Sequence, residues 1–223
     1  MAQVRTLSDL TTVIEDDLQR SDLTTAVSQA VADALQYYQS ERFWFSETRS
    51  VELTTVASQM IYDSTDEDEL PTFITLDHVW IIRTGDQVWE LERISIGEWE
   101  QLADGSASTG WPYFFAFFNE KLYLYPDPDD AYTIRLTGHQ GMIDDTAAGT
   151  SFGIGPPNSA DPNPYMRSAF ELLRAHAKQL VYFHKLQDLE LAASMQPFIE
   201  RALSALRRET GMRATSTIVP TQF

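Results

Sequence analysis

Two acidic runs contain the residues with the clearest potential for chemistry. Asp66-Glu67-Asp68-Glu69 is the first, and the second has carboxylates at Asp127, Asp129 and Asp130. Clustered carboxylates could bind a hard cation such as calcium. However, neither run has the alternating ligand spacing and the glycine of an EF-hand loop. We therefore interpret both runs as solvated acidic turns, with a cation site as the alternative.

No other motif in the sequence predicts catalysis. Gly153-Ile154-Gly155-Pro156-Pro157 is a poor match to a dinucleotide-binding loop, because its prolines remove amides that a phosphate would need. His176 and His184 are eight positions apart on one expected helix, too far to chelate one ion. No Gly-x-Ser-x-Gly elbow is present. We expect no enzyme activity, no catalytic residue, no metal ligand and no cofactor.

Composition indicates a folded protein. The 223 residues are 43% hydrophobic and 12% aromatic, enough for a sizeable core, and we expect the whole chain to fold as one domain. The absence of cysteine excludes disulfides and thiolate metal sites. The N-terminus lacks the apolar core of a signal peptide, and no apolar run approaches the roughly 20 residues that span a bilayer. We expect a protein of the cytosol, or of a particle assembled there, without a membrane partner.

The charge balance is the strongest deviation. The formal net charge is -17, from 33 acidic and 16 basic residues. A chain this acidic is repelled by phosphate backbones, because nucleic acids are held by clusters of Lys and Arg. We expect negligible affinity for duplex DNA, although DNA could still pass such a surface. A soluble surface in a salty habitat explains the acidity equally well.

Helical periodicity occurs at both ends of the chain. The N-terminal part predicts helices over about 7–19 and 24–42, the first opened by a capping box of Thr6 and Asp9. The second helix ends at Phe43-Trp44-Phe45. The C-terminal part predicts helices over about 165–186 and 188–210, the latter bent or divided at Pro197 and ended by Gly211.

Strand periodicity fills the middle. Three hairpins are predicted, joined by tight turns: 51–56 with 59–62, 78–83 with 87–92, and 113–118 with 121–125. A last strand covers 132–137, and Ser95 with Glu98 opens a short helix over 96–102. The aromatic run Trp111–Phe118 has two apolar faces, which predicts a core strand that also contributes to an oligomer contact. Residues 138–164, rich in Gly, Pro, Asn and Asp, predict a long loop.

Together these patterns predict an α+β fold. We expect a bundle of about four main helices, two N-terminal and two C-terminal, with an inserted antiparallel β-sheet region and an extended C-terminal tail. The expected segments are N-terminal helices (1–47), a β region with a short helix (48–138), a long loop (139–164), C-terminal helices (165–211) and an extended arm (212–223).

The order of motifs resembles that of the tailed-bacteriophage adaptor proteins, the head-completion or head-to-tail connector family. The likeness extends over nearly the whole chain. Its pieces are Leu7-x-x-Leu10, Glu41-Arg42-Phe43-Trp44-Phe45-Ser46-Glu47, Val51-Glu52-Leu53-Thr54-Thr55 with Gln59-Met60-Ile61-Tyr62, Gly110-Trp111-Pro112-Tyr113-Phe114, and Leu122-Tyr123-Leu124-Tyr125-Pro126-Asp127-Pro128. The loop over 144–163 departs from the family pattern by its length and its Gly and Pro content.

The resemblance implies a non-enzymatic structural protein at the head-tail interface of a virion, assembled in the host cytoplasm. Such a protein forms a homo-oligomeric ring, expected to have twelve copies, beneath the portal. It extends the DNA channel without binding DNA specifically, and it contacts the portal protein and tail or stopper proteins. A cation- or glycan-binding β module of a virion or surface protein is the alternative, and an acid-catalysed glycan hydrolase is a third.

The C-terminal end is the predicted portal or subunit interface. It is locally basic within an acidic chain, and its last residues favour an extended strand that could add to a partner. A dispensable free end is the alternative. The candidate interface residues are Arg207, Arg208, Arg213, Ile218, Val219 and Phe223.

Overall fold

The protein divides into two compact units. A computed structural model describes residues 6–64, 70, 72–83, 87–105, 108–145, 151–154 and 164–214. The helical unit takes its described residues from Met1–Ser46, Asp144–Gly153 and Ala160–Phe223, and the β unit takes them from Glu47–Ile143 and Ile154–Ser159. Each unit buries its own set of apolar side chains.

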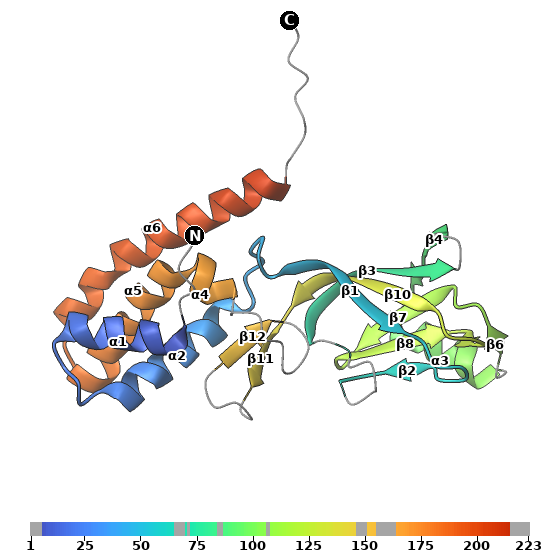
Figure 1. Ribbon diagram of the computed structural model, residues 1–223, viewed down its shortest axis with the longest axis horizontal. Helices are drawn as coiled ribbons and strands as arrows, with labels where there is room; N and C mark the ends of the chain where they lie inside the picture. Colours follow the sequence, from blue (N-terminus) through green and yellow to red (C-terminus); the bar gives the residue numbers. More distant parts are fainter. Residues whose placement is uncertain are drawn as a thin grey trace, which may run out of the picture. The chain divides into compact units, whose positions relative to one another are not determined.

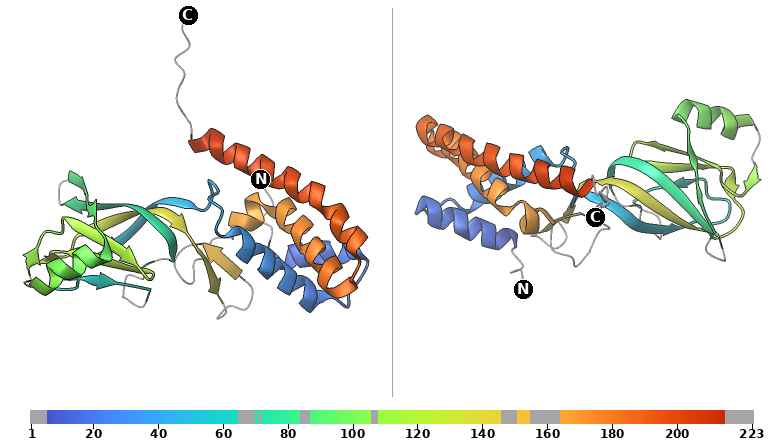
Figure 2. Two further views of the ribbon diagram at one scale, coloured as in Figure 1. Left: turned by 180° about the vertical axis from the view of Figure 1, so that it is seen from behind. Right: turned by 90° about the horizontal axis from the view of Figure 1, so that it is seen from above.

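In the helical unit, α5 is the central helix. It packs against both α2 and α6, while α1 packs mainly against α2 (Figures 1 and 2). The helices are α1 (Leu7–Leu18), α2 (Thr24–Tyr38), α4 (Pro164–Ser168), α5 (Phe170–Val181), the short π-helix η1 (Tyr182–Leu186) and α6 (Leu189–Ala214). The predicted capping box of α1 is confirmed, because Asp9 N donates to Thr6 Oγ1 at 3.1 Å and Thr6 N donates to Asp9 Oδ2 at 2.7 Å.

In the β unit, most of the strands form two four-stranded sheets. Their orders are β1-β10-β3-β4 and β2-β8-β7-β5, and a further pair is β6-β9. The elements are β1 (Glu47–Thr54), β2 (Ile61–Tyr62), β3 (Phe73–Arg83), β4 (Gln87–Glu90), β5 (Glu92–Arg93), α3 (Ile96–Gly105), β6 (Thr109–Gly110), β7 (Phe114–Phe118), β8 (Lys121–Tyr125), β9 (Asp127–Pro128) and β10 (Thr133–Gln140). Strand β11 (Met142–Asp145) pairs with β12 (Ser151–Ile154), and this pair includes residues of the segment assigned to the helical unit.

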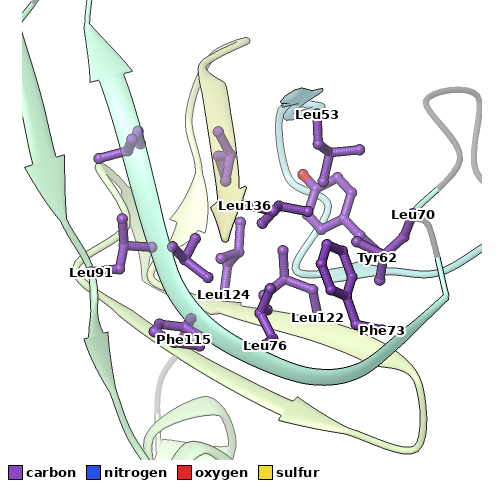
Figure 3. Close-up of a cluster of buried hydrophobic side chains, with 13 residues drawn as sticks. Leu53, Tyr62, Leu70, Phe73, Leu76, Leu91, Phe115, Leu122, Leu124 and Leu136 are labelled. Atoms are coloured by element: carbon purple, nitrogen blue, oxygen red, sulfur yellow. The ribbon is translucent and has the colours of Figure 1, made fainter. Parts of the chain in front are cut away.

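The core of the β unit brings the two four-stranded sheets together. Alternate residues of β8 and β10 are buried, as expected for strands with one face on a core. Figure 3 shows side chains from both sheets converging on one apolar cluster. Its labelled members are Leu53, Tyr62, Leu70, Phe73, Leu76, Leu91, Phe115, Leu122, Leu124 and Leu136.

Two of the three predicted hairpins are confirmed and one is wrong. β3 pairs with β4, and β7 pairs with β8, both antiparallel. The expected hairpin of 51–56 with 59–62 does not form, because β1 pairs with β10 and β2 pairs with β8. The two segments therefore enter different sheets. The aromatic run contributes Phe115 to the core, while Tyr113 and Phe118 are 60% and 56% exposed.

The predicted bundle of about four main helices with an inserted antiparallel β region is wrong as an account of the fold. The described residues form an α+β fold with six α-helices and twelve strands, and the β part is a unit with its own core. Two short pairs, β5-β7 and β6-β9, are parallel. The β5-β7 pair is possible because α3 lies between its strands in the chain and supplies the crossover connection.

The predicted ends of the C-terminal elements also need correction. Strand β10 continues to Gln140, and β11 and β12 lie within the segment expected to be a loop. Pro197 lies inside α6 without dividing it, and Gly211 does not end the helix. The predicted extended arm over 212–223 is therefore wrong at its start, because α6 runs to Ala214. The i,i+4 pair of Glu209 and Arg213 supports this last turn.

Gly138 is expected to be essential to the pairing of β10 with β3. A Cβ atom at this position would lie 2.3 Å from the carbonyl oxygen of Thr75. We predict that Gly138→Ala lowers the free energy of unfolding by about 2–3 kcal/mol, since backbone must move to relieve the clash. Urea denaturation followed by tryptophan fluorescence measures the change.

Gly110→Ala is the matched control for this prediction. Its Cβ would meet nothing within 4 Å, so the free energy of unfolding should change by less than about 0.5 kcal/mol. Equal denaturation midpoints for the Gly138→Ala variant and the wild type would contradict the proposed close approach.

Candidate interface on the C-terminal helix

Helix α6 carries the three basic residues that sequence reasoning placed at an interface. Its first turn is capped by Asp188, whose Oδ1 accepts a hydrogen bond from Leu191 N at 2.9 Å. Its three buried residues, Ala192, Ile199 and Leu206, are seven positions apart and form one narrow stripe. Most of the remaining surface of α6 is therefore exposed.

Arg207 connects α6 to the segment that follows α2. Its Nη2 donates to Glu41 Oε1 at 2.5 Å, and its Nε donates to Glu41 Oε2 at 3.3 Å. The hydrogen bond that Arg207 donates to this carboxylate raises the pKa of Arg207. An exposed pair of this kind adds little stability, but its two-point geometry fixes the direction of the guanidinium.

Arg213 makes a second connection to the same segment. Its guanidinium lies 3.6 Å from the ring centroid of Trp44, in cation–π geometry, and its Nη2 donates to Glu209 Oε1 at 2.6 Å. In addition, Trp44 N donates to Thr210 Oγ1 at 3.3 Å. The last turns of α6 are thus held on residues 41–44.

An aromatic cluster keeps this segment in place. Phe43 is fully buried and stacks on Phe45 with ring centroids 5.2 Å apart, and Phe45 meets Tyr165 edge-on at 4.9 Å. Ser46 Oγ donates to Phe43 O at 2.9 Å, while Tyr165 Oη donates to Tyr38 O at 3.2 Å. Burial raises the pKa of the Tyr165 phenol and raises that of Tyr38 to about 12, so both phenols are neutral at physiological pH.

The structure brings together only part of the predicted interface. Arg207 and Arg213 both contact residues 41–44, whereas Arg208 is exposed and has no ion-pair partner in the described part of the chain. Ile218, Val219 and Phe223 lie outside the described residues. Sequence reasoning missed Glu41 as the partner of Arg207, because the two residues are 166 positions apart and no local signal connects them.

A groove lies between α5 and α6, and the sequence patterns did not predict it. Its volume is about 510 Å³, and it combines an apolar floor with a charged rim of three basic side chains and the carboxylate of Glu171. Met195 and Phe198 of α6 line it beside Ala175 of α5, together with Arg174 and Arg201. The seven-residue spacing of Leu191, Phe198 and Ala205 is the sequence signal that could have revealed it.

Asp17 of α1 holds two of the cations that line this groove. Its carboxylate accepts hydrogen bonds from Arg174 Nη2 at 2.7 Å and from Lys178 Nζ at 3.2 Å. Arg174 is the main cause of a lowered pKa at Asp17, and partial burial opposes the shift. The cluster joins α1 to α5 across the helical unit.

We predict that Asp17→Asn destabilises the chain at neutral pH by about 1 kcal/mol, a value reduced for the partial exposure of the cluster. Because the folded pKa lies below the reference value of 3.8, the stabilisation is fully present above that pH and disappears as the pH falls through the folded pKa. The wild-type and variant unfolding curves should therefore converge in acid.

Asp22→Asn is the control for this experiment, because Asp22 pairs with Arg20 on a fully exposed surface. It should leave the unfolding curve unchanged at pH 7. A stability difference between wild type and Asp17→Asn that stays constant from pH 7 to below pH 3.8 would contradict the role given to the carboxylate charge.

The other residues singled out in the sequence occupy structural positions. Asp129 Oδ1 accepts a hydrogen bond from Tyr132 Oη at 2.5 Å, and Asp130 Oδ1 accepts one from Ala131 N at 2.8 Å. The run 66–69 and residues 155–157 lie outside the described residues. Within the described ranges, no three His, Asp or Glu side chains form a group that could hold a metal ion.

The two histidines of the C-terminal helical segments contact aromatic rings. His176 meets Tyr37 and Tyr38 edge-on, and burial lowers its pKa. His184 lies against the ring of Phe183.

Comparison with protein families identifies a match to this chain. The family model described as SU10 adaptor protein matches residues 5–221, which is nearly the whole chain. A search of the curated proteins gives no match. Within the described part of the chain, none of the helices has the length and apolar character needed to cross a membrane.

Proposed function

This chain belongs to the SU10 adaptor protein family, which confirms the predicted resemblance to a phage head-tail adaptor family, and we propose that it is a structural, non-enzymatic component of the head-tail joint. In this proposal, twelve copies assemble in the host cytoplasm into a ring beneath the portal. The ring extends the DNA channel and provides the attachment site for the tail or for stopper proteins. The family match over residues 5–221 is the observation that carries the proposal.

The charge of the chain supports a channel role. A net charge of -17 repels the phosphate backbone, so DNA would slide along a ring of such chains without being held by neutralised phosphates. Twelve copies multiply this repulsion around the channel.

The C-terminal end supports the attachment role. Arg208 is exposed near the end of α6 without an ion-pair partner among the described residues, and the residues after Ala214 include the apolar Ile218, Val219 and Phe223. Cationic and apolar side chains at the end of a firmly held helix suit a contact with a portal subunit. Repetition of this contact around a ring would make twelve weak contacts act together.

Negative-stain imaging of the purified chain with and without the portal ring of the same phage tests the proposal. We expect an additional ring coaxial with the portal in the mixture. Arg208→Glu should reduce the fraction of decorated portals, because it places a negative charge at the proposed contact. Lys185→Glu, an equal change of charge at another exposed position of the helical unit, is the control. Portals that stay undecorated at saturating wild-type protein would rule the proposal out.

A further inference from the structure

We infer that the groove between α5 and α6 binds an amphipathic α-helix of another protein, whose apolar stripe is flanked by acidic side chains. The inference rests on the proposed function for its setting, a joint between virion proteins. Its test requires only the folded chain.

An exposed apolar stripe on α6 is the first observation. The exposed residues Leu191, Phe198, Ala205 and Met212 recur every seven positions. Phe198 and Met212 are 60% and 71% exposed, so no described part of this chain covers them. A seven-residue apolar repeat over three heptads is the pattern of a helix that packs against another helix.

Intervening residues complete the pattern. Met195 and Ala202 lie four positions after Leu191 and Phe198, which gives the alternating spacing of four and three that knobs-into-holes packing requires. Met195, Phe198 and Ala202 all line the groove beside Ala175 of α5. The stripe is distinct from the buried residues of α6, each of which lies one position further along the chain.

The charged side chains beside the stripe indicate the chemistry of the partner helix. Arg201 and Arg208 flank the stripe on α6, seven positions apart, and both are exposed without an ion-pair partner in the described part of the chain. On the α5 side, Arg174 and Lys178 are already paired with Asp17, and Arg174 also lies 3.6 Å from the carboxylate of Glu171. Two uncompensated cations beside an apolar stripe, in a chain of net charge -17, favour a partner with acidic flanking positions.

The same charges argue against a second copy of α6 in the groove. In an antiparallel pair, Arg201 and Arg208 of the two copies would face each other and repel. In a parallel pair, they would face the positions of Ala192, Ile199 and Leu206, which are buried in their own chain. A partner helix with acidic flanking positions avoids both conflicts.

Two synthetic peptides of about 28 residues test the inference, each with Leu at the a and d heptad positions. The first has Glu at the flanking e and g positions, and the second has Lys there. Fluorescence anisotropy with the full-length chain in physiological salt measures both. We expect the Glu peptide to bind about fivefold more tightly than the Lys peptide, because two exposed charge pairs form at the rim. The double variant Arg201→Glu/Arg208→Glu should reverse this preference.

Phe198→Glu and Phe183→Glu are the matched variants, because both phenylalanines are more than half exposed and only Phe198 lies in the groove. The first should abolish binding of the Glu peptide, and the second should leave it unchanged. Circular dichroism establishes that both variants are folded.

The inference is overturned by no binding of either peptide, by equal binding of both, by loss of binding in Phe183→Glu, or by retained binding in Phe198→Glu. If Phe198→Glu instead lowers the sedimentation coefficient of the chain alone, the occupant is a second copy and the inference is wrong. None of these measurements uses the portal, so they can fail or succeed independently of the proposed ring.

Discussion

A chain ending at Ala214 is expected to keep its melting temperature and to lose its attachment to portal-bearing capsids. The deletion removes Ile218, Val219 and Phe223, the apolar residues of the proposed contact, and leaves α6 complete. Since the described cores of both units lie before residue 215, stability should change little. Sedimentation of capsids mixed with labelled protein measures the attachment.

The position of the cut matters. A deletion starting at Met212, where the sequence predicted the tail to begin, would also remove Arg213 and its contact with the ring of Trp44. That shorter chain would combine loss of a partner contact with loss of an intramolecular one. Ending the chain at Ala214 separates the two effects.

Point variants test the same contact without shortening the chain. Ile218→Asp/Val219→Asp should abolish attachment, because it places charges in an apolar contact. Thr215→Asp/Thr217→Asp adds the same charge at polar positions of the segment, and this variant should retain much of the attachment. Truncated protein that still decorates capsids like the full-length chain would show that residues 215–223 are a dispensable end.

Phe43→Ala is expected to produce the largest loss of stability. Phe43 is fully buried, stacks on Phe45 and meets Tyr165 edge-on with ring centroids 6.1 Å apart. Removing a buried phenylalanine ring costs about 3–5 kcal/mol, through lost transfer energy and the cavity left behind. Urea denaturation should show a correspondingly lower midpoint.

The same variant should also loosen the end of α6. Phe43 lies between Glu41 and Trp44, which hold Arg207 and Arg213. Faster hydrogen exchange is therefore expected in the last turns of α6, and not only around the cavity. Phe183→Ala is the control, because Phe183 is 52% exposed and should cost less than about 0.5 kcal/mol. A Phe43→Ala variant as stable as this control would show that the cluster contributes little.

Several elements were predictable because their signals are local. The capping boxes at Thr6 and Ser95 join residues three positions apart, and both form. The hairpins β3-β4 and β7-β8 also form as predicted, because their short turns dictate which strands meet. The order of these local motifs was sufficient to indicate the adaptor family.

Partners that are distant in the chain could not be predicted in this way. The segment from Val51 predicted a hairpin with its neighbour, yet β1 pairs with β10, where Glu52 and Arg135 form an ion pair across 83 positions. Which strands pair depends on the summed energy of many cross-strand contacts. These energies cannot be ranked from a single sequence. The separate β core followed from this choice of partner.

The candidate interface also has a part that was predictable from the sequence and a part that was not. The sequence by itself determined that the C-terminal end is basic within an acidic chain, because charge depends on composition alone. Only the tertiary structure decided that Glu41 and Trp44 hold Arg207 and Arg213 while Arg208 has no ion-pair partner among the described residues, since those contacts join positions that only folding brings together. It also decided which apolar stripe of α6 is buried. Both stripes repeat every seven residues, and α5 covers one and leaves Phe198 exposed.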